Sequence, residues 1–199
     1  MTEQLRIWAG LQGFISAASL LALLLFFGLA TPFGNEQRQW SWLGPVNDWL
    51  SVLGAAPWIV ASVLLALRVR APWWFWALTV LLAIAVLAAA LVTVLMLAGR
   101  ASLQLQFAFA IPMIAISFLW LAFAGVLGTR SVALPAWMGV FAVGIAVAFA
   151  LGAVIVGVAF AVPEATGWRM PLLITGAVPG FLAMIAFPVW WICVASTAR

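Results

Sequence analysis

The chain contains no histidine, no lysine and no tyrosine, and Cys193 is its single cysteine. Without histidine it cannot build a His-ligated haem site, a His-bound metal site or a Ser-His-Asp triad. Without lysine it cannot form a retinal Schiff base or a P-loop, and one cysteine cannot hold an iron–sulfur cluster. We therefore expect no catalytic residues, no cofactor and no metal. An intramembrane enzyme that uses Asp48 or Glu164 is the remaining enzymatic alternative.

Charged residues are scarce as well. They make up 6% of the 199 residues, whereas 68% are hydrophobic, so there is too little polar side chain to cover a water-soluble domain. The formal net charge of +4 arises because eight basic residues outnumber four acids. These arginines are dispersed along the chain instead of clustered on one face, which argues against a nucleic-acid partner. The expected partner is the lipid bilayer.

The arginines separate long uncharged runs, and this spacing predicts a membrane topology. The runs 71–99, 101–129, 131–163 and 170–198 contain no charged residue, and each exceeds the roughly 20 apolar residues that a membrane-spanning helix needs. Prolines, glycines and polar segments divide the chain into six helices, approximately 11–30, 47–68, 72–99, 106–128, 135–162 and 171–197. The predicted fold is an all-α, polytopic transmembrane bundle of six helices that forms one integral membrane domain over residues 1–199.

Six crossings place both termini on one side of the membrane. If that side is cytoplasmic, it carries five arginines (Arg6, Arg68, Arg70, Arg130 and Arg199), and the outer side carries three (Arg38, Arg100 and Arg169). The positive-inside rule favours this orientation. We therefore predict a multi-pass protein of the bacterial plasma membrane with cytoplasmic N- and C-termini.

The chain divides into three helical hairpins, about 1–70, 71–130 and 131–199, which are candidates for a weak internal repeat. Pro57, Pro112 and Pro179 each fall about two turns into the returning helix of a hairpin. A proline there kinks the helix and releases the carbonyl four residues earlier, which predicts a central cavity touched by Leu53, Ala108 or Thr175. The alternative is that these prolines have no role beyond their general frequency in transmembrane helices.

Three further patterns carry structural predictions. Most of the 13 tryptophans fall at predicted helix ends, including Trp190 and Trp191, where indole rings anchor a protein in the membrane interface; ligand stacking is the alternative. Asn47 and Asp48 stand where the second helix is expected to begin, which predicts helix capping. A stripe of small residues, Gly144, Ala148 and Gly152, predicts packing within the bundle or a homodimer interface.

Polar and aromatic residues gather at the predicted outer side and form a candidate rim for a ligand or a partner protein. We include the deeper Trp58 with them. The rim residues are Glu36, Arg38, Trp40, Trp42, Asn47, Asp48, Trp58, Glu164, Trp168 and Arg169.

The order of these parts resembles that of bacterial six-helix integral membrane proteins of similar length, a family of unknown function. The resemblance rests on the segment Trp-Ser-Trp-Leu-Gly-Pro-Val-Asn-Asp-Trp-Leu at 40–50 and on Phe-Pro-Val-Trp-Trp at 187–191. It implies topology only. We expect a non-catalytic accessory or scaffold subunit of a membrane assembly; the alternative is a small carrier or receptor for an apolar or weakly polar ligand, such as a lipid or a quinone, held between kinked helices.

Overall fold

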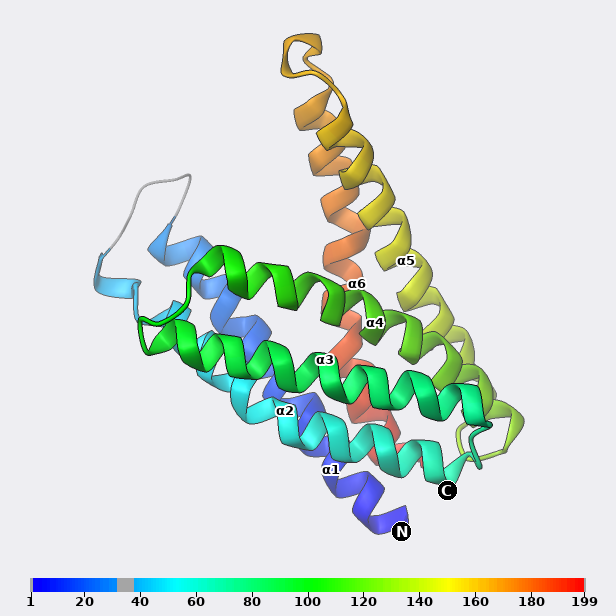
Figure 1. The fold of residues 1–199 in the computed structure, drawn as a ribbon. Helices are drawn as coiled ribbons and strands as arrows, with labels where there is room; N and C mark the ends of the chain where they lie inside the picture. The colour runs from blue at the N-terminus through cyan, green and yellow to red at the C-terminus, as the bar shows by residue number, and fades with distance from the viewer. Residues whose placement is uncertain (1, 32–37, 199) are drawn as a thin grey trace.

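The structure is a computed structural model, and it describes residues 2–31 and 38–198. Six long helices run through the described chain (Figure 1): α1 (Thr2–Leu25), α2 (Leu43–Arg68), α3 (Trp73–Leu97), α4 (Leu103–Arg130), α5 (Ala136–Ala161) and α6 (Arg169–Thr197). A π-helical turn, η1 (Phe26–Ala30), extends α1, and the short 3-10 helices η3 (Arg38–Trp40) and η4 (Glu164–Thr166) lie in turns. All six long helices are long and apolar enough to cross a membrane. The predicted six-helix transmembrane bundle is confirmed.

Two helices begin four or more residues earlier than the sequence predicts. α1 begins at Thr2 and not near residue 11, and α2 begins at Leu43 and not at Asn47. Pro45 lies in the first turn of α2, where proline is tolerated because the backbone N–H that it lacks has no helical partner anyway. Asn47 is therefore inside the helix, and so is Asp48. The prediction that these two side chains cap α2 is wrong.

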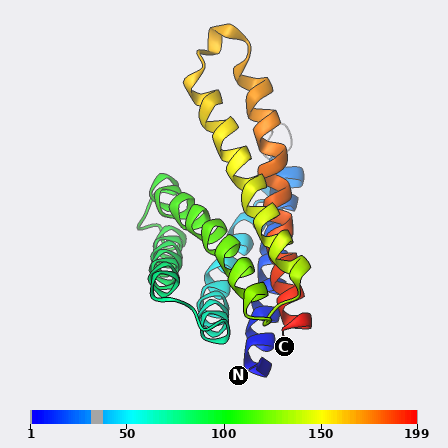
Figure 2. The same cartoon turned by 90° about the vertical axis from the view of Figure 1, so that its right-hand side faces the viewer.

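The helices pack as a closed ring. Each helix contacts the next one along the chain, and α6 returns to contact α1. Both termini lie at the same end of the bundle (Figures 1 and 2). We call this the terminal end, and we call the opposite end, where α2 and α4 begin, the distal end.

The core fills the terminal half of the ring with aromatic side chains. Phe75 stacks on Trp120 with ring centroids 5.5 Å apart, Trp120 stacks on Trp191 at 5.7 Å, and Trp190 meets Trp191 edge-on at 5.0 Å. The indole N–H of Trp120 donates to Thr79 Oγ1 at 3.0 Å, and that of Trp190 donates to the Met138 carbonyl at 3.2 Å. These contacts join α3, α4, α5 and α6.

Trp190 and Trp191 are fully buried in this core. The prediction that they anchor the bundle in the membrane interface is therefore wrong for these two residues. By contrast, Trp73, Trp137 and Trp168 are exposed at helix ends, as interface anchors require.

The distal half is more open. The hairpin of α5 and α6 diverges from the other four helices and projects beyond them (Figures 1 and 2). Within this hairpin the two helices approach closely, because a Cβ atom added to Gly152 would lie 2.7 Å from the carbonyl oxygen of Gly176. Gly152 thus packs inside the bundle, whereas Gly144 has no atom within 4 Å of a Cβ added there.

Candidate functional site

A cavity of about 480 Å³ lies inside the ring, towards its distal end. Its walls come from five of the six helices, and only α5 does not contribute. At the distal end the ring of Phe26 packs against Gly44, where a Cβ would lie 3.2 Å from Phe26 Cε2. Deeper in the bundle, a Cβ added to Gly54 of α2 would lie 3.2 Å from Ile15 Cγ2 and 3.7 Å from Gln12 Oε1 of α1. The cavity therefore extends along the α1–α2 pair from the distal ends of these helices towards the middle of the bundle.

Aromatic side chains close the deep end. Trp58 packs against Phe187 with ring centroids 5.2 Å apart, and Phe187 meets Phe118 edge-on at 5.6 Å. Phe187, Pro188 and Trp58 all line the cavity. Pro188 belongs to the Phe-Pro-Val-Trp-Trp segment, but the sequence did not single it out as a cavity residue. This aromatic floor separates the cavity from the packed terminal half.

One wall carries a continuous polar strip. On α1, Gln12, Ser16 and Ser19 recur at helical spacing and line the cavity together. The Gln12 amide donates to Ser16 Oγ at 2.9 Å, and the Ser19 hydroxyl donates to Asn47 Oδ1 at 2.8 Å. Ser51 lies one turn after Asn47 on α2. Its Oγ is 3.1 Å from Ser19 Oγ, and it donates to the Asn47 carbonyl at 3.0 Å. Sequence reasoning missed the α1 half of this strip, although its i, i+4, i+7 spacing was visible.

Asp48 faces the cavity beside this strip. It is half-buried, and it is the only charged residue among those that line the cavity. The Gln106 amide of α4 lies 3.4 Å from Asp48 Oδ1 and also donates to Thr93 Oγ1 of α3 at 3.2 Å. Asp48, Gln106 and Thr93 thus link three helices through long polar contacts at the distal part of the cavity.

Two buried polar atoms in the cavity wall have no hydrogen-bond partner: Gln12 Oε1, an acceptor, and Trp58 Nε1, a donor. Gln12 is fully buried, and its Oε1 would lie 3.7 Å from a Cβ at Gly54, one helical turn before Trp58. A buried polar group without a partner is costly, so such groups in native proteins are usually satisfied by water or by a ligand. The deep end of the cavity therefore offers one acceptor and one donor to an occupant.

The predicted rim residues do not converge on one mouth. Asn47, Asp48 and Trp58 line the cavity. Three others are exposed in or beside the turn that precedes α2 and do not line it, namely Arg38, Trp40 and Trp42. Glu36 lies outside the described residues.

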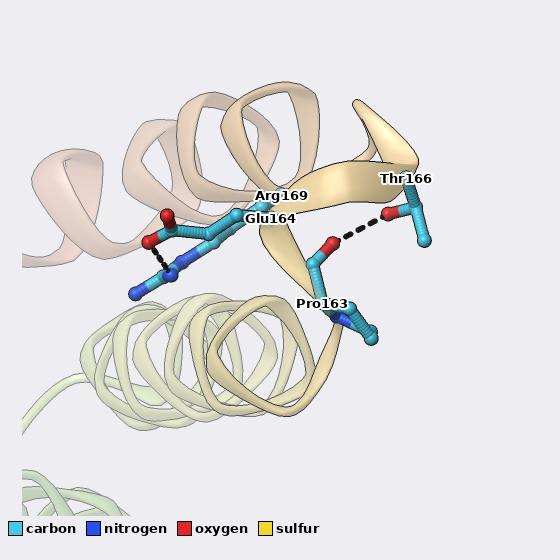
Figure 3. Close-up of polar contacts among 4 residues, drawn as sticks. All are labelled: Pro163, Glu164, Thr166 and Arg169. Carbon is cyan, nitrogen blue, oxygen red and sulfur yellow. Dashed lines mark hydrogen bonds and ion pairs between the residues drawn. The ribbon is translucent and has the colours of Figure 1, made fainter.

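The remaining rim residues are Glu164, Trp168 and Arg169, which lie in or beside the turn between α5 and α6. The tip of this hairpin stands apart from the distal ends of α1–α4 in both ribbon views (Figures 1 and 2). There Arg169 forms an ion pair with Glu164, and the Thr166 hydroxyl donates to the Pro163 carbonyl at 2.8 Å (Figure 3). The Arg169 guanidinium also lies 5.4 Å from the Phe160 ring. These contacts stabilise the turn that contains Trp168. The charges of Glu164 and Arg169 neutralise each other, so neither needs a ligand as its partner.

The prolines predicted to frame the cavity lie inside helices but do not line it. Pro57 is buried, Pro179 is half-buried and Pro112 is exposed. The residues whose carbonyls they would release, Leu53, Ala108 and Thr175, are exposed and are not part of the cavity wall. A cavity is present, but the prediction that these three residues touch it is wrong.

Comparisons with protein-family models, with curated proteins and with solved structures find no match to this chain. Nor do three or more histidine, cysteine, aspartate or glutamate side chains come together as a metal site among residues 2–31 and 38–198.

Proposed function

We propose that this protein binds a small, mostly apolar molecule in the distal cavity and acts as a carrier or receptor for it. The observation that supports this proposal is a cavity of about 480 Å³ with an apolar wall and two buried, unpartnered polar atoms at its deep end. This volume lies within the range of about 300–1,000 Å³ that is typical of small-molecule sites. A ligand that enters from the bilayer would bury its apolar surface against side chains such as Leu23, Phe107 and Met113.

The orientation of the site follows from the proposed topology. With both termini in the cytoplasm, as the arginine distribution favours, the distal end faces the exterior and the cavity lies in the outer half of a bacterial plasma membrane. The closed aromatic floor favours a receptor, or a carrier that is seen in an outward-facing state. The sequence analysis favoured an accessory or scaffold subunit, and this second proposal has no comparable geometric feature in its support.

Filling the cavity tests the proposed function. Ala110 of α4 lines the cavity, whereas Ala115 of the same helix is exposed and does not line it. We expect the wild-type protein, extracted in a mild detergent and analysed by native mass spectrometry, to retain a small molecule. Ala110→Trp should lose that molecule because the indole occupies its space, and Ala115→Trp should keep it. A stoichiometric protein partner, with no small molecule retained by any variant, would contradict ligand binding and favour the accessory subunit.

A further inference from the structure

We infer that the molecule bound in this cavity is an amphiphilic cation whose positive charge pairs with Asp48. This inference rests on the proposed ligand-binding function and names the chemical class of the ligand. It starts from the charges that face the cavity. Asp48 contributes one carboxylate, and no arginine is among the lining residues. The cavity wall therefore has a negative group without a positive counterpart.

The carboxylate of Asp48 has two side-chain partners, the Gln106 amide and the amide of the neighbouring Asn47. Gln106 Nε2 approaches at 3.4 Å, which is long for a hydrogen bond, and the same amide group also serves Thr93 at 3.2 Å. An ionised carboxylate can accept about four hydrogen bonds. A half-buried acid in a largely apolar cavity is stabilised when a cation supplies the missing donors and the opposite charge.

The surroundings of Asp48 suit an organic ammonium group. Three hydroxyl groups line the cavity together with Asp48, those of Ser19 and Ser51 in the α1–α2 strip and that of Thr93 on α3. Phe26 and Phe107 line the same cavity, and the face of an aromatic ring attracts a cation. The rest of the wall is apolar and fits a hydrocarbon body. A bare metal ion would leave most of the 480 Å³ without a matching group.

The ligand also has a preferred direction in the cavity. Its charged end lies at Asp48, near the distal ends of the helices, and its apolar body extends towards Trp58 and Phe187. At the deep end, Gln12 Oε1 and Trp58 Nε1 are left for a water molecule or for one uncharged polar group of the ligand. The inference thus assigns separate roles to the single acid and to the unpartnered neutral atoms.

Three probes with one apolar body test this inference: 1-adamantylamine, which is cationic, 1-adamantanol, which is neutral, and 1-adamantanecarboxylate, which is anionic. Their affinities are measured by equilibrium dialysis against the protein in lipid nanodiscs, and empty nanodiscs are used to subtract partition into lipid. We expect the wild-type protein to bind the amine at least about tenfold more tightly than the alcohol, and the carboxylate most weakly.

Asp48→Asn should abolish the preference for the amine and leave the affinity for the alcohol unchanged, because asparagine keeps the shape of the side chain and removes its charge. Glu164→Gln is the matched control, since Glu164 is exposed at the hairpin tip and already paired with Arg169; the preference should persist in that variant. The cavity-filled Ala110→Trp variant should bind none of the three probes.

The outcomes distinguish the proposal that the cavity binds a small molecule from the inference that this molecule is a cation. Equal affinity of the wild-type protein for amine and alcohol, or an amine preference that survives Asp48→Asn, would overturn the cationic ligand while leaving cavity binding in place. Failure of every probe to bind, together with the absence of a small molecule from the purified protein, would overturn both.

Discussion

Polar side chains inside this bundle each need a partner, because the bilayer core offers none. Some buried groups of the core are paired, although Ser62 Oγ and Trp191 Nε1 have no hydrogen-bond partner. Trp120 donates to Thr79, whose hydroxyl in turn donates to the carbonyl of Phe75 at 2.8 Å, so a short chain of hydrogen bonds crosses from α4 to α3. Gln12 and Trp58 also keep buried atoms without a partner, and these two residues line the cavity, whereas Ser62 and Trp191 do not. An occupant of the cavity is therefore placed to supply partners for Gln12 Oε1 and Trp58 Nε1.

The Trp120–Thr79 contact can be tested by removing its acceptor. Thr79→Val keeps the side-chain shape but leaves the buried indole N–H without a partner, and we expect a loss of about 1–3 kcal/mol of unfolding free energy. Thr175→Val is the matched control, since Thr175 also donates to the carbonyl four residues earlier but is exposed. Its effect should stay within about 0.5 kcal/mol. Unfolding in detergent measures both, and equal effects would show that the interhelical bond contributes nothing.

At the level of helices, glycines set which faces can meet. Gly152 lets α5 approach α6, because a Cβ at this position would lie 2.8 Å from the backbone nitrogen of Gly180. At the other side of α6, a Cβ at Gly13 of α1 would lie 2.6 Å from a side-chain carbon of Ile192. α6 is thus held between two close glycine contacts, one with each neighbour in the ring.

A pair of alanine substitutions on α5 distinguishes this packing from simple helix propensity. Gly152→Ala should destabilise the protein by about 1–3 kcal/mol, because the new methyl group overlaps backbone atoms of α6 that cannot move independently. Gly144→Ala, two turns earlier, has open space and should be neutral or stabilising by up to about 1 kcal/mol, as alanine favours a helix over glycine. Melting temperatures in detergent measure both changes. Equal destabilisation by the two substitutions would contradict the close-contact account.

The sequence predicts where the helices lie along the chain far better than it predicts which face of each helix packs inwards. Helix ends are marked by Pro72, Gly99 and the arginines, so the count and approximate limits follow directly. In lipid, however, a helix is apolar all round, and no amphipathic pattern tells which side turns inwards. Trp190 and Trp191 therefore look the same in sequence as an interface anchor such as Trp137. Two faces were readable from the sequence: the polar strip, because Ser16 and Ser19 repeat on one side of α1, and the small-residue stripe that contains Gly152 on α5.

At the scale of the molecule, a packed terminal half supports a looser distal half. The aromatic core from Phe75 to Trp191 closes the ring near the termini, and the α5–α6 hairpin diverges beyond it (Figure 2). A ligand bound between α4 and the α1–α2 pair would connect α2 and α4, which touch each other little directly. We therefore expect bound ligand to stabilise the distal half more than the terminal half, which hydrogen exchange of the backbone amides would measure. Protection confined to the terminal half would contradict binding in the distal cavity.

The side of the membrane that the cavity faces depends on topology, and this can be measured directly. Arg6, Arg68, Arg70 and Arg130 lie in or beside helix ends at the terminal end, whereas Arg38, Arg100 and Arg169 lie in or beside helix ends at the distal side. Since positive residues are retained in the cytoplasm, a reporter fused after Arg199 should report the cytoplasm, and one fused after Arg100 should report the exterior. The cavity would then receive its ligand from the outer leaflet or from the medium beyond it. The reverse result at both positions would keep the six crossings but turn the cavity towards the cytoplasmic leaflet, so that a cationic ligand would have to come from inside the cell.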